Sequence, residues 1–225
     1  MTIVCEERFS DSPYVETVMH GHTLSDGCAI RPAETHWHMV FVERQGRREP
    51  LVVGPWSAAG TATWGDEAQI LWIKFRLGVF MPHLPTKVFL DAETPLPGAA
   101  SRSFWLKGSA WQLPDYENVE AFVARLVREE VLVCDPVVDT VLQEQPHELS
   151  PRTVRHRFLR ATGLTQGHVY QAQRALRAAA LLRHGVSILD TMDEAGYYDQ
   201  PHLTRSLKRF IGYTPAQIAQ AEPPT

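Results

Sequence analysis

The hydrophobic pattern changes its period near residue 115, and this change constrains the fold of the chain more than any other feature. Before it, short runs of β-branched and aromatic residues alternate with turn formers, at residues 39–42, 51–53 and 69–75. Such runs predict short strands. After it, apolar residues recur at spacings of three and four, which predicts a helix containing Val119, Phe122, Val123, Leu126 and Val127.

These patterns predict an α+β protein in three parts. Residues 1–114 are expected to form a β-rich domain, either a small antiparallel sheet or a small β-barrel. Residues 115–134 form a linking helix, and residues 135–225 form an all-α domain. Within this domain Asp135 starts a short helix, and a break at residues 145–147 separates it from the helices that follow.

The charges of the two halves have opposite signs. The chain has 225 residues and a net charge of −4, from 22 Lys and Arg against 26 Asp and Glu. Residues 150–225 contain ten of these cations and five of the anions, a balance of +5, which leaves 12 against 21, or −9, for residues 1–149. A basic module joined to an acidic one is typical of a DNA-reading domain attached to a regulatory domain, and the same asymmetry would also serve to dock one half onto the other.

Residues 150–163 predict a short helix with marked ends. Ser150 is a candidate N-cap, Pro151 occupies the first turn, and Gly163 ends the helix. One side carries the apolar residues Val154, Phe158 and Ala161. The opposite side is rich in cations and carries Arg152, His156, Leu159 and Arg160, with Arg155 at its edge. Such a face suits the major groove of DNA, where Arg bonds to guanine edges.

A second short helix is expected from Gln200 to about Ile211, with Asp199 as its N-cap and Gly212 at its end. Its apolar side holds Leu203, Leu207 and Phe210, and its outer side holds Gln200, Pro201, Thr204, Arg205 and Lys208. A turn containing Gly196 separates it from a preceding helix. A helix, a turn with Gly and a second short helix are the parts of a helix-turn-helix.

A long Ala-rich helix, about residues 168–184, stands between the two short helices. Its expected buried stripe is Val169, Ala172, Leu176, Ala179 and Ala180. About 17 residues span roughly 25 Å, and successive major grooves on one face of DNA are about 34 Å apart. The long helix could therefore present both short helices to neighbouring grooves.

Residues 190–215, together with residues 150–163, resemble the signature of the AraC/XylS family of transcription regulators. The resemblance implies two helix-turn-helix units, with base contacts from Arg152, Arg155, His156, Gln200, Thr204 and Arg205. It implies DNA backbone contacts or structural supports at Arg160, Lys208 and Arg209. Arg157 flanks the buried side, so we expect it to support packing.

The sequence departs from this family at two places. Met192 stands where the family usually has a small Ala, and residues 135–149 hold room for one helix where the family has two. The Met192 departure and the moderate charge of the chain keep open an interaction adaptor whose helix-turn-helix units have degenerated.

By the same resemblance, residues 1–114 would form a cupin-like domain that responds to a small-molecule effector or a partner. His36, His38 and Glu43 have a cupin-like spacing and are candidate ligands of a divalent metal. The surrounding glycines do not fit the cupin motif, and the later His of a second motif has only unsupported candidates in His20, His22 and His83. We therefore expect no metal and no cofactor.

The leading hypothesis is a sequence-specific transcription regulator, and by resemblance an activator, whose partners are double-stranded promoter DNA and RNA polymerase. A homodimer is a further expectation. A metal-dependent enzyme on a cupin domain is the alternative, but Gly-X-Ser-X-Gly, phosphate-binding and His-Glu-X-X-His motifs are absent from the sequence. No apolar run approaches roughly 20 residues and the start lacks a signal-peptide pattern, which favours a nucleoid-associated protein of the cytoplasm without membrane contact.

Overall fold

The chain forms two compact units that interleave along the sequence, in a computed structural model that describes residues 3–100 and 102–220. Among the described residues, unit 1 contains 3–27, 36–55, 63–100 and 102–165. Unit 2 contains the helices after residue 165 and two segments from the N-terminal half, residues 28–35 and 56–62. The boundaries predicted at residues 114 and 134 are not tested by this division and stay predictions.

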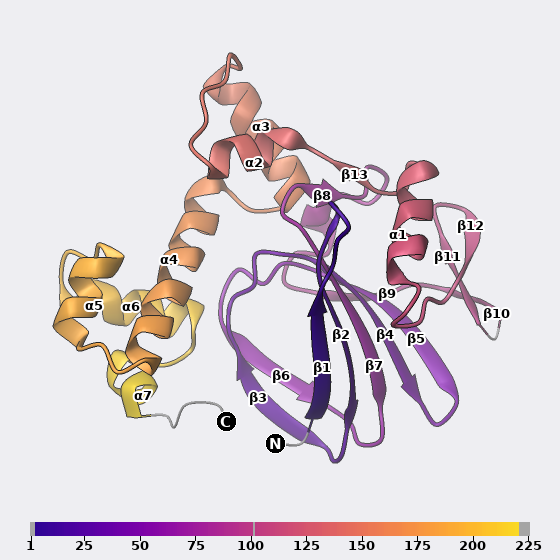
Figure 1. Ribbon diagram of the computed structural model, residues 1–225, viewed down its shortest axis with the longest axis horizontal. Helices are drawn as coiled ribbons and strands as arrows, with labels where there is room; N and C mark the ends of the chain where they lie inside the picture. The colour runs from indigo at the N-terminus through magenta and orange to yellow at the C-terminus, as the bar shows by residue number, and fades with distance from the viewer. Residues whose placement is uncertain (1–2, 101, 221–225) are drawn as a thin grey trace. The chain divides into compact units, whose positions relative to one another are not determined.

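Unit 1 is built on a six-stranded antiparallel sheet in the order β1-β2-β7-β4-β5-β9 (Figure 1). Its strands are β1 (Ile3–Phe9), β2 (Val15–Thr23), β4 (His38–Arg44), β5 (Arg47–Val53), β7 (Gln69–Phe75) and β9 (Glu93–Pro95). The runs predicted as strands lie in β4, β5 and β7, so a β-rich N-terminal region is confirmed. The sheet ends at β1 and β9, and the described strands do not close into a barrel. The cupin-like assignment stays a prediction.

Smaller groups of strands complete the β structure. The pairs are β3 (Gly27–Arg31) with β6 (Gly60–Trp64), and β8 (Val79–Phe80) with β13 (Val133–Cys134). A three-stranded sheet contains β10 (Gly98–Ala100), β11 (Ser103–Leu106) and β12 (Ser109–Gln112). A single turn of 3-10 helix, η1 (Thr86–Val88), follows β8.

The core of unit 1 forms where α1 (Val119–Arg128) packs with the sheet. The alternation of β7 buries Leu71, Ile73 and Phe75, as expected for a strand with one face in a core. The predicted helical face of α1 is confirmed, with Val119, Val123 and Leu126 buried and Phe122 and Val127 packed against the same core.

The C-terminal region is helical, as predicted. Unit 1 contains α2 (Pro136–Leu142) and α3 (Pro151–Thr162), and unit 2 contains α4 (Gln166–Arg183), α5 (Ile188–Ala195), α6 (Gln200–Phe210) and α7 (Pro215–Gln220). Within the described residues, none of the helices has both the length and the apolar composition to cross a membrane.

The buried stripe predicted for α4 was wrong in part. Val169, Ala172 and Ala179 are buried as expected, but Leu176 is 38% exposed and Ala180 is exposed. The buried positions are instead completed by Ala175, Ala178 and Leu182. The helix is so rich in alanine that hydrophobic spacing alone did not define its inner side, and the packing of α5, α6 and α7 around it decided the direction.

An ion pair joins β1 to α1 in unit 1. Arg8 donates to both carboxylate oxygens of Glu120, over 2.7 and 3.0 Å, and the Ser10 hydroxyl donates to Oε1 over 2.8 Å. These hydrogen bonds, that of Arg8 above all, lower the pKa of Glu120 to about 2, although burial acts to raise it.

We predict that Glu120→Gln lowers the free energy of unfolding by about 1 kcal/mol at neutral pH, a small loss because solvent screens this half-exposed pair. The folded-state pKa lies below the ordinary value of 4.5, so the carboxylate stabilises the fold above that pH and loses this contribution as the pH falls toward 2. Urea unfolding at several pH values should show the difference between parent and variant vanish in acid. Glu148→Gln, at an exposed position outside this ion pair, is the control, and a difference that persisted at pH 2 would contradict the assignment.

Candidate nucleic-acid interface

The ends of α3 are set by the local signals that the sequence contains. The Ser150 side chain accepts a hydrogen bond from the Thr153 N–H over 3.2 Å, and proline occupies the first turn. Gly163 ends the helix with φ of 72°, in the left-handed region that favours glycine. The predicted start and end of this helix are confirmed.

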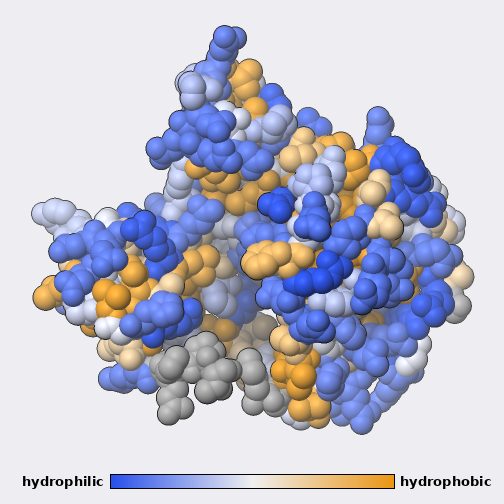
Figure 2. All heavy atoms as spheres, viewed as in Figure 1, coloured by the Kyte–Doolittle hydropathy of each residue, from blue (hydrophilic) through white to orange (hydrophobic). Residues whose placement is uncertain are grey.

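One side of α3 is buried and the other is cationic. Val154, Phe158 and Ala161 are buried, and the Thr86 hydroxyl of η1 donates to the Ala161 carbonyl over 3.2 Å. The three residues predicted to contact bases here are all exposed: Arg152, Arg155 and His156. Figure 2 shows the surface around α3, at the top of the view, as mostly hydrophilic.

The two remaining cations of α3, Arg157 and Arg160, contact neighbouring elements of unit 1. Arg157 makes two hydrogen bonds to the Asp135 carboxylate, over 3.0 and 2.7 Å, and these raise the pKa of the Arg157 side chain above its ordinary value. Asp135 also accepts from the Val137 N–H and so caps α2. The Arg160 guanidinium lies 5.3 Å from the centre of the Phe80 ring. Arg157 therefore links α3 to the start of α2, and Arg160 lies over the Phe80 ring of β8.

Helices α5 and α6 each start at a side-chain cap. Ser187 accepts from the Asp190 N–H at the start of α5, and Asp199 accepts from the His202 N–H over 2.6 Å at the start of α6. Leu203, Leu207 and Phe210 are buried, as predicted for the inner side of α6. The outer side holds exposed Gln200, Arg205, Lys208 and Arg209, with Thr204 half-buried.

The turn between α5 and α6 is braced by side chains that the sequence analysis did not assign. Gly196 adopts φ of 70°, and the Tyr197 hydroxyl lies 2.9 Å from the Ser206 hydroxyl of α6. Arg174 of α4 lies over the Tyr197 ring, 4.4 Å from its centre, and donates to the Gly196 carbonyl over 3.4 Å. Arg174 and Tyr197 lie on the inner side of the unit formed by α5, the turn and α6. Their spacing in the sequence did not predict that they would be in contact.

Both departures from the family signature have a structural counterpart. Met192 is half-buried and packs against the unit 2 core, so its flexible side chain is accommodated between the helices. Helix α2 ends at Leu142, and residues 143–149 connect it to α3 without a further helix. The first candidate unit is therefore short, as the sequence predicted.

The three residues considered as metal ligands do not come together. Glu43 accepts from Arg48 over 2.7 and 3.3 Å, and this contact lowers the pKa of Glu43. The His36 ring lies 2.9 Å from the Glu16 carboxylate, and the His38 ring meets Trp72 edge-on. Across the described part of the chain, no three His, Cys, Asp or Glu side chains are grouped to hold a metal ion.

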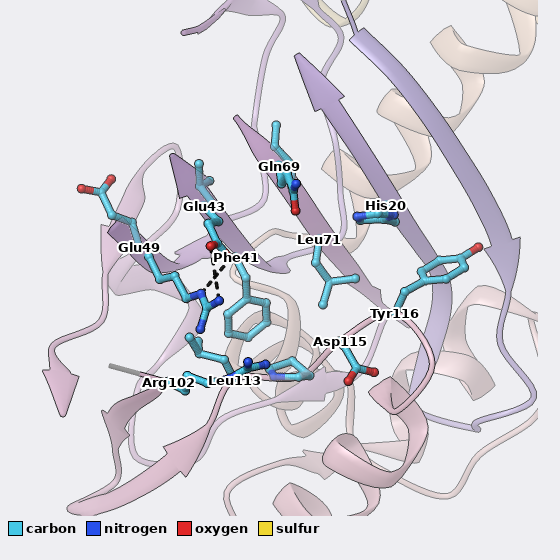
Figure 3. A pocket seen from close by; sticks show the side chains of 14 residues that line it. His20, Phe41, Glu43, Glu49, Gln69, Leu71, Arg102, Leu113, Asp115 and Tyr116 are labelled. Carbon is cyan, nitrogen blue, oxygen red and sulfur yellow. Dashed lines mark hydrogen bonds and ion pairs between the residues drawn. The ribbon is translucent and has the colours of Figure 1, made fainter. Parts of the chain in front are cut away.

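A pocket of about 160 Å³ opens on the sheet of unit 1 (Figure 3). Phe41, Leu71 and Leu113 supply apolar surface, and Figure 3 shows Glu43 beside Phe41. Glu43 is paired with Arg48, which also lines the pocket. The remaining lining is mixed: it contains the aliphatic residues Val42, Ile70 and Pro114 and polar or aromatic residues that include His20, Gln69, Arg102, Asp115 and Tyr116. The pocket can accept a small molecule that has an apolar part and hydrogen-bonding groups.

The fold and the exposed face of α6 define a helix-turn-helix of the DNA-binding class. A family model described as "Helix-turn-helix domain" matches residues 147–221. These residues form a helix-turn-helix domain of the AraC type, so the resemblance predicted from the sequence is confirmed.

Among curated proteins, the chain is similar to the HTH-type transcriptional regulator RipA of Corynebacterium glutamicum, with 36% identity over 95 residues, 41% of this chain and 29% of the relative. The RipA of Corynebacterium diphtheriae is 35% identical over 89 residues, 39% of this chain and 27% of the relative. The HTH-type transcriptional activator RhaS of Escherichia coli is 29% identical over 141 residues, 58% of this chain and 49% of the relative.

The chain thus spans less than half the length of each of these relatives. The relatives are transcription regulators, which supports the prediction that the chain is not an enzyme. No solved structure matches the chain.

We predict that Arg174→Ala lowers the free energy of unfolding by about 1–2 kcal/mol, because it removes a cation from the Tyr197 ring and a donor from the Gly196 carbonyl. Urea unfolding at neutral pH measures the change. Arg183→Ala, at an exposed position in the last turn of α4, is the matched control. Equal losses in the two variants would show that Arg174 does not brace the turn.

Proposed function

We propose that the chain is a sequence-specific transcription regulator that reads promoter DNA with two helices, α3 and α6. The observation that carries this proposal is the pair of capped helices, each with a buried apolar side and an exposed side that contains cations. Arg152, Arg155 and His156 would contact bases from α3, and Gln200, Thr204 and Arg205 from α6. Arg160, Lys208 and Arg209 would contact the DNA backbone.

The geometry of α6 suits this role for physical reasons. Its exposed Gln200 and Arg205 are long side chains with the donor groups that base edges in the major groove accept. Lys208 and Arg209 lie in its last turn, where their charge attracts phosphates. Because the apolar stripe of α6 is held in the core, these side chains are presented from a fixed support rather than from a loop.

Activation is the direction of control that we propose, since one relative is named a transcriptional activator. An activator in this role would contact RNA polymerase, and a homodimer would bind two copies of its DNA half-site.

We further propose that a small molecule controls DNA binding from the pocket of unit 1. The charges of the Glu43–Arg48 pair satisfy one another, while Phe41, Leu71 and Leu113 offer apolar contact area. Arg102 also lowers the pKa of Glu43, so this carboxylate stays ionised at neutral pH. A ligand with an apolar body and a few polar groups matches this lining.

Replacing Arg205 tests the assignment of α6. We predict that Arg205→Ala costs about 1–3 kcal/mol on a duplex that the full chain selects from a random-sequence pool, and relaxes preference at one base position. Fluorescence anisotropy measures the affinity, and a repeated selection measures the preference. Arg128→Ala, which removes an exposed cation from α1, is the control. Unchanged affinity and preference in Arg205→Ala would refute the assignment.

Replacing Lys208 should act differently. We expect Lys208→Ala to weaken binding to selected and random duplexes by similar factors, and to reduce the slope of log affinity against log salt by roughly one, because a phosphate contact releases a counterion. Titrations at several salt concentrations measure the slope. Selective loss on the selected duplex alone would identify Lys208 as a base-reading residue and contradict the backbone role.

The pocket can be tested with a panel of small carboxylates and amines that contain aromatic or aliphatic groups. We predict that at least one raises the Tm of the parent, and that Leu113→Trp, which fills the pocket, removes this effect. Val4→Trp, at an exposed position of β1, is the control for adding an indole. A ligand that stabilises Leu113→Trp as much as the parent binds elsewhere and rules out this pocket.

A further inference from the structure

Two segments from the N-terminal half of the chain meet the end of the second reading helix. We call residues 28–35 and 56–62 the clamp; both segments belong to unit 2, with α4, α5, α6 and α7. In the clamp, Glu34 and Trp56 exchange two backbone hydrogen bonds, of 3.0 and 2.7 Å. The Arg31 guanidinium lies 3.8 Å from the centre of the Trp56 ring. The two segments are therefore joined to one another.

The clamp caps the C-terminal end of α6 with backbone donors. The last carbonyl groups of a helix lack partners inside that helix. Here the Arg209 carbonyl accepts from the Ala59 N–H over 2.8 Å, and the Phe210 carbonyl accepts from the Ala33 N–H over 2.6 Å. Both donors come from the N-terminal half of the chain, outside residues 147–221 that match the helix-turn-helix model.

Side-chain packing reinforces these two hydrogen bonds. Ala33 is only 3% exposed and belongs to the same apolar cluster as Leu207, Phe210 and Ile218. Gly212 follows α6 with φ of +90°, and a Cβ atom at this position would lie 2.4 Å from Cγ2 of Ile30. The Ile30 side chain of the clamp thus lies so close to the Gly212 backbone that a larger residue at position 212 would displace either Ile30 or the chain at position 212.

We propose that the clamp positions the second reading helix for DNA recognition. This inference rests on the proposed function of α6. The N-terminal end of α6 is held by its own cap at Asp199, and the clamp holds the opposite end. Arg205 and Lys208 lie between these two supports and Arg209 lies at the second, so the clamp sets the direction in which their side chains project. Ala33, Ala59 and Ile30 are positioning residues that act through α6.

The first test separates the contact at Gly212 from backbone strain. Gly212→Ala places a methyl group against Ile30, whereas Gly185→Ala imposes a similar positive φ, +82°, in open space. We expect Gly212→Ala to lower affinity for the selected duplex about tenfold and for a random duplex by less than about twofold. Gly185→Ala should bind both as the parent does. In Ile30→Ala/Gly212→Ala the clash is removed, and affinity for the selected duplex should return.

Hydrogen exchange in the full chain provides a readout that needs no DNA. The amide hydrogens of Ala33 and Ala59 should exchange slowly in the parent and in Gly185→Ala, faster in Gly212→Ala, and slowly again in the double variant. If the parent prefers no duplex sequence, the proposed function fails, and the exchange of these two amides still decides whether the clamp holds α6.

A second pair of variants covers the case in which Gly212→Ala does not fold. Ala59→Pro removes the N–H that donates to the Arg209 carbonyl. Ala58→Pro is the matched control, because the N–H groups of the clamp that donate to α6 are those of Ala33 and Ala59. We expect Ala59→Pro to lose affinity for the selected duplex more than for the random duplex, and Ala58→Pro to bind both as the parent does. Equal loss on selected and random duplexes, no rescue by Ile30→Ala, or equal effects of the two proline variants would overturn the proposal.

Discussion

Burial of the apolar stripe of α6 against the alanine side of α4 is the interaction on which the orientation of the exposed side of α6 depends. Leu203, Leu207 and Phe210 are almost fully buried, and each such side chain contributes roughly 1.5–3 kcal/mol when it leaves water. Four of the six buried residues of α4 are alanines, whose small side chains let helices approach closely. Once this side of α6 is fixed inward, helical periodicity directs Gln200 and Arg205 outward.

The two ends of α6 are held by different means. Its start is capped by Asp199, one residue before the helix, so this boundary is a local property and was predicted from the sequence. Its end is capped by the N–H groups of Ala33 and Ala59, which come from distant parts of the chain. Alanine carries no chemical signal of such a role, and a backbone donor is available at any residue except proline. No motif could therefore have identified these two positions.

Among the described residues, the sheet and its pocket also combine local features that the sequence predicts with distant contacts that it does not. The strands around Val40, Val52 and Ile73 were predicted because alternating and continuous apolar runs have a strong local signature. Their order in the sheet, with β7 between β2 and β4, depends on pairings between residues far apart in sequence. Glu43 was considered as a metal ligand on spacing alone, and the register of β4 with β5 places it beside Arg48 instead.

The sequence by itself determined the helix boundaries at Ser150, Gly163 and Asp199, the apolar and cationic sides of α3 and α6, and the resemblance to AraC-type regulators. These are short-range properties, because caps, turns and helical faces depend on residues within a few positions of one another. Only the tertiary structure decided which side of α4 is buried, that Arg174 supports the turn at Tyr197, and that the N-terminal half supplies part of unit 2. Each of these features depends on contacts between residues far apart in the sequence, and the local spacing of residues does not specify which of them meet.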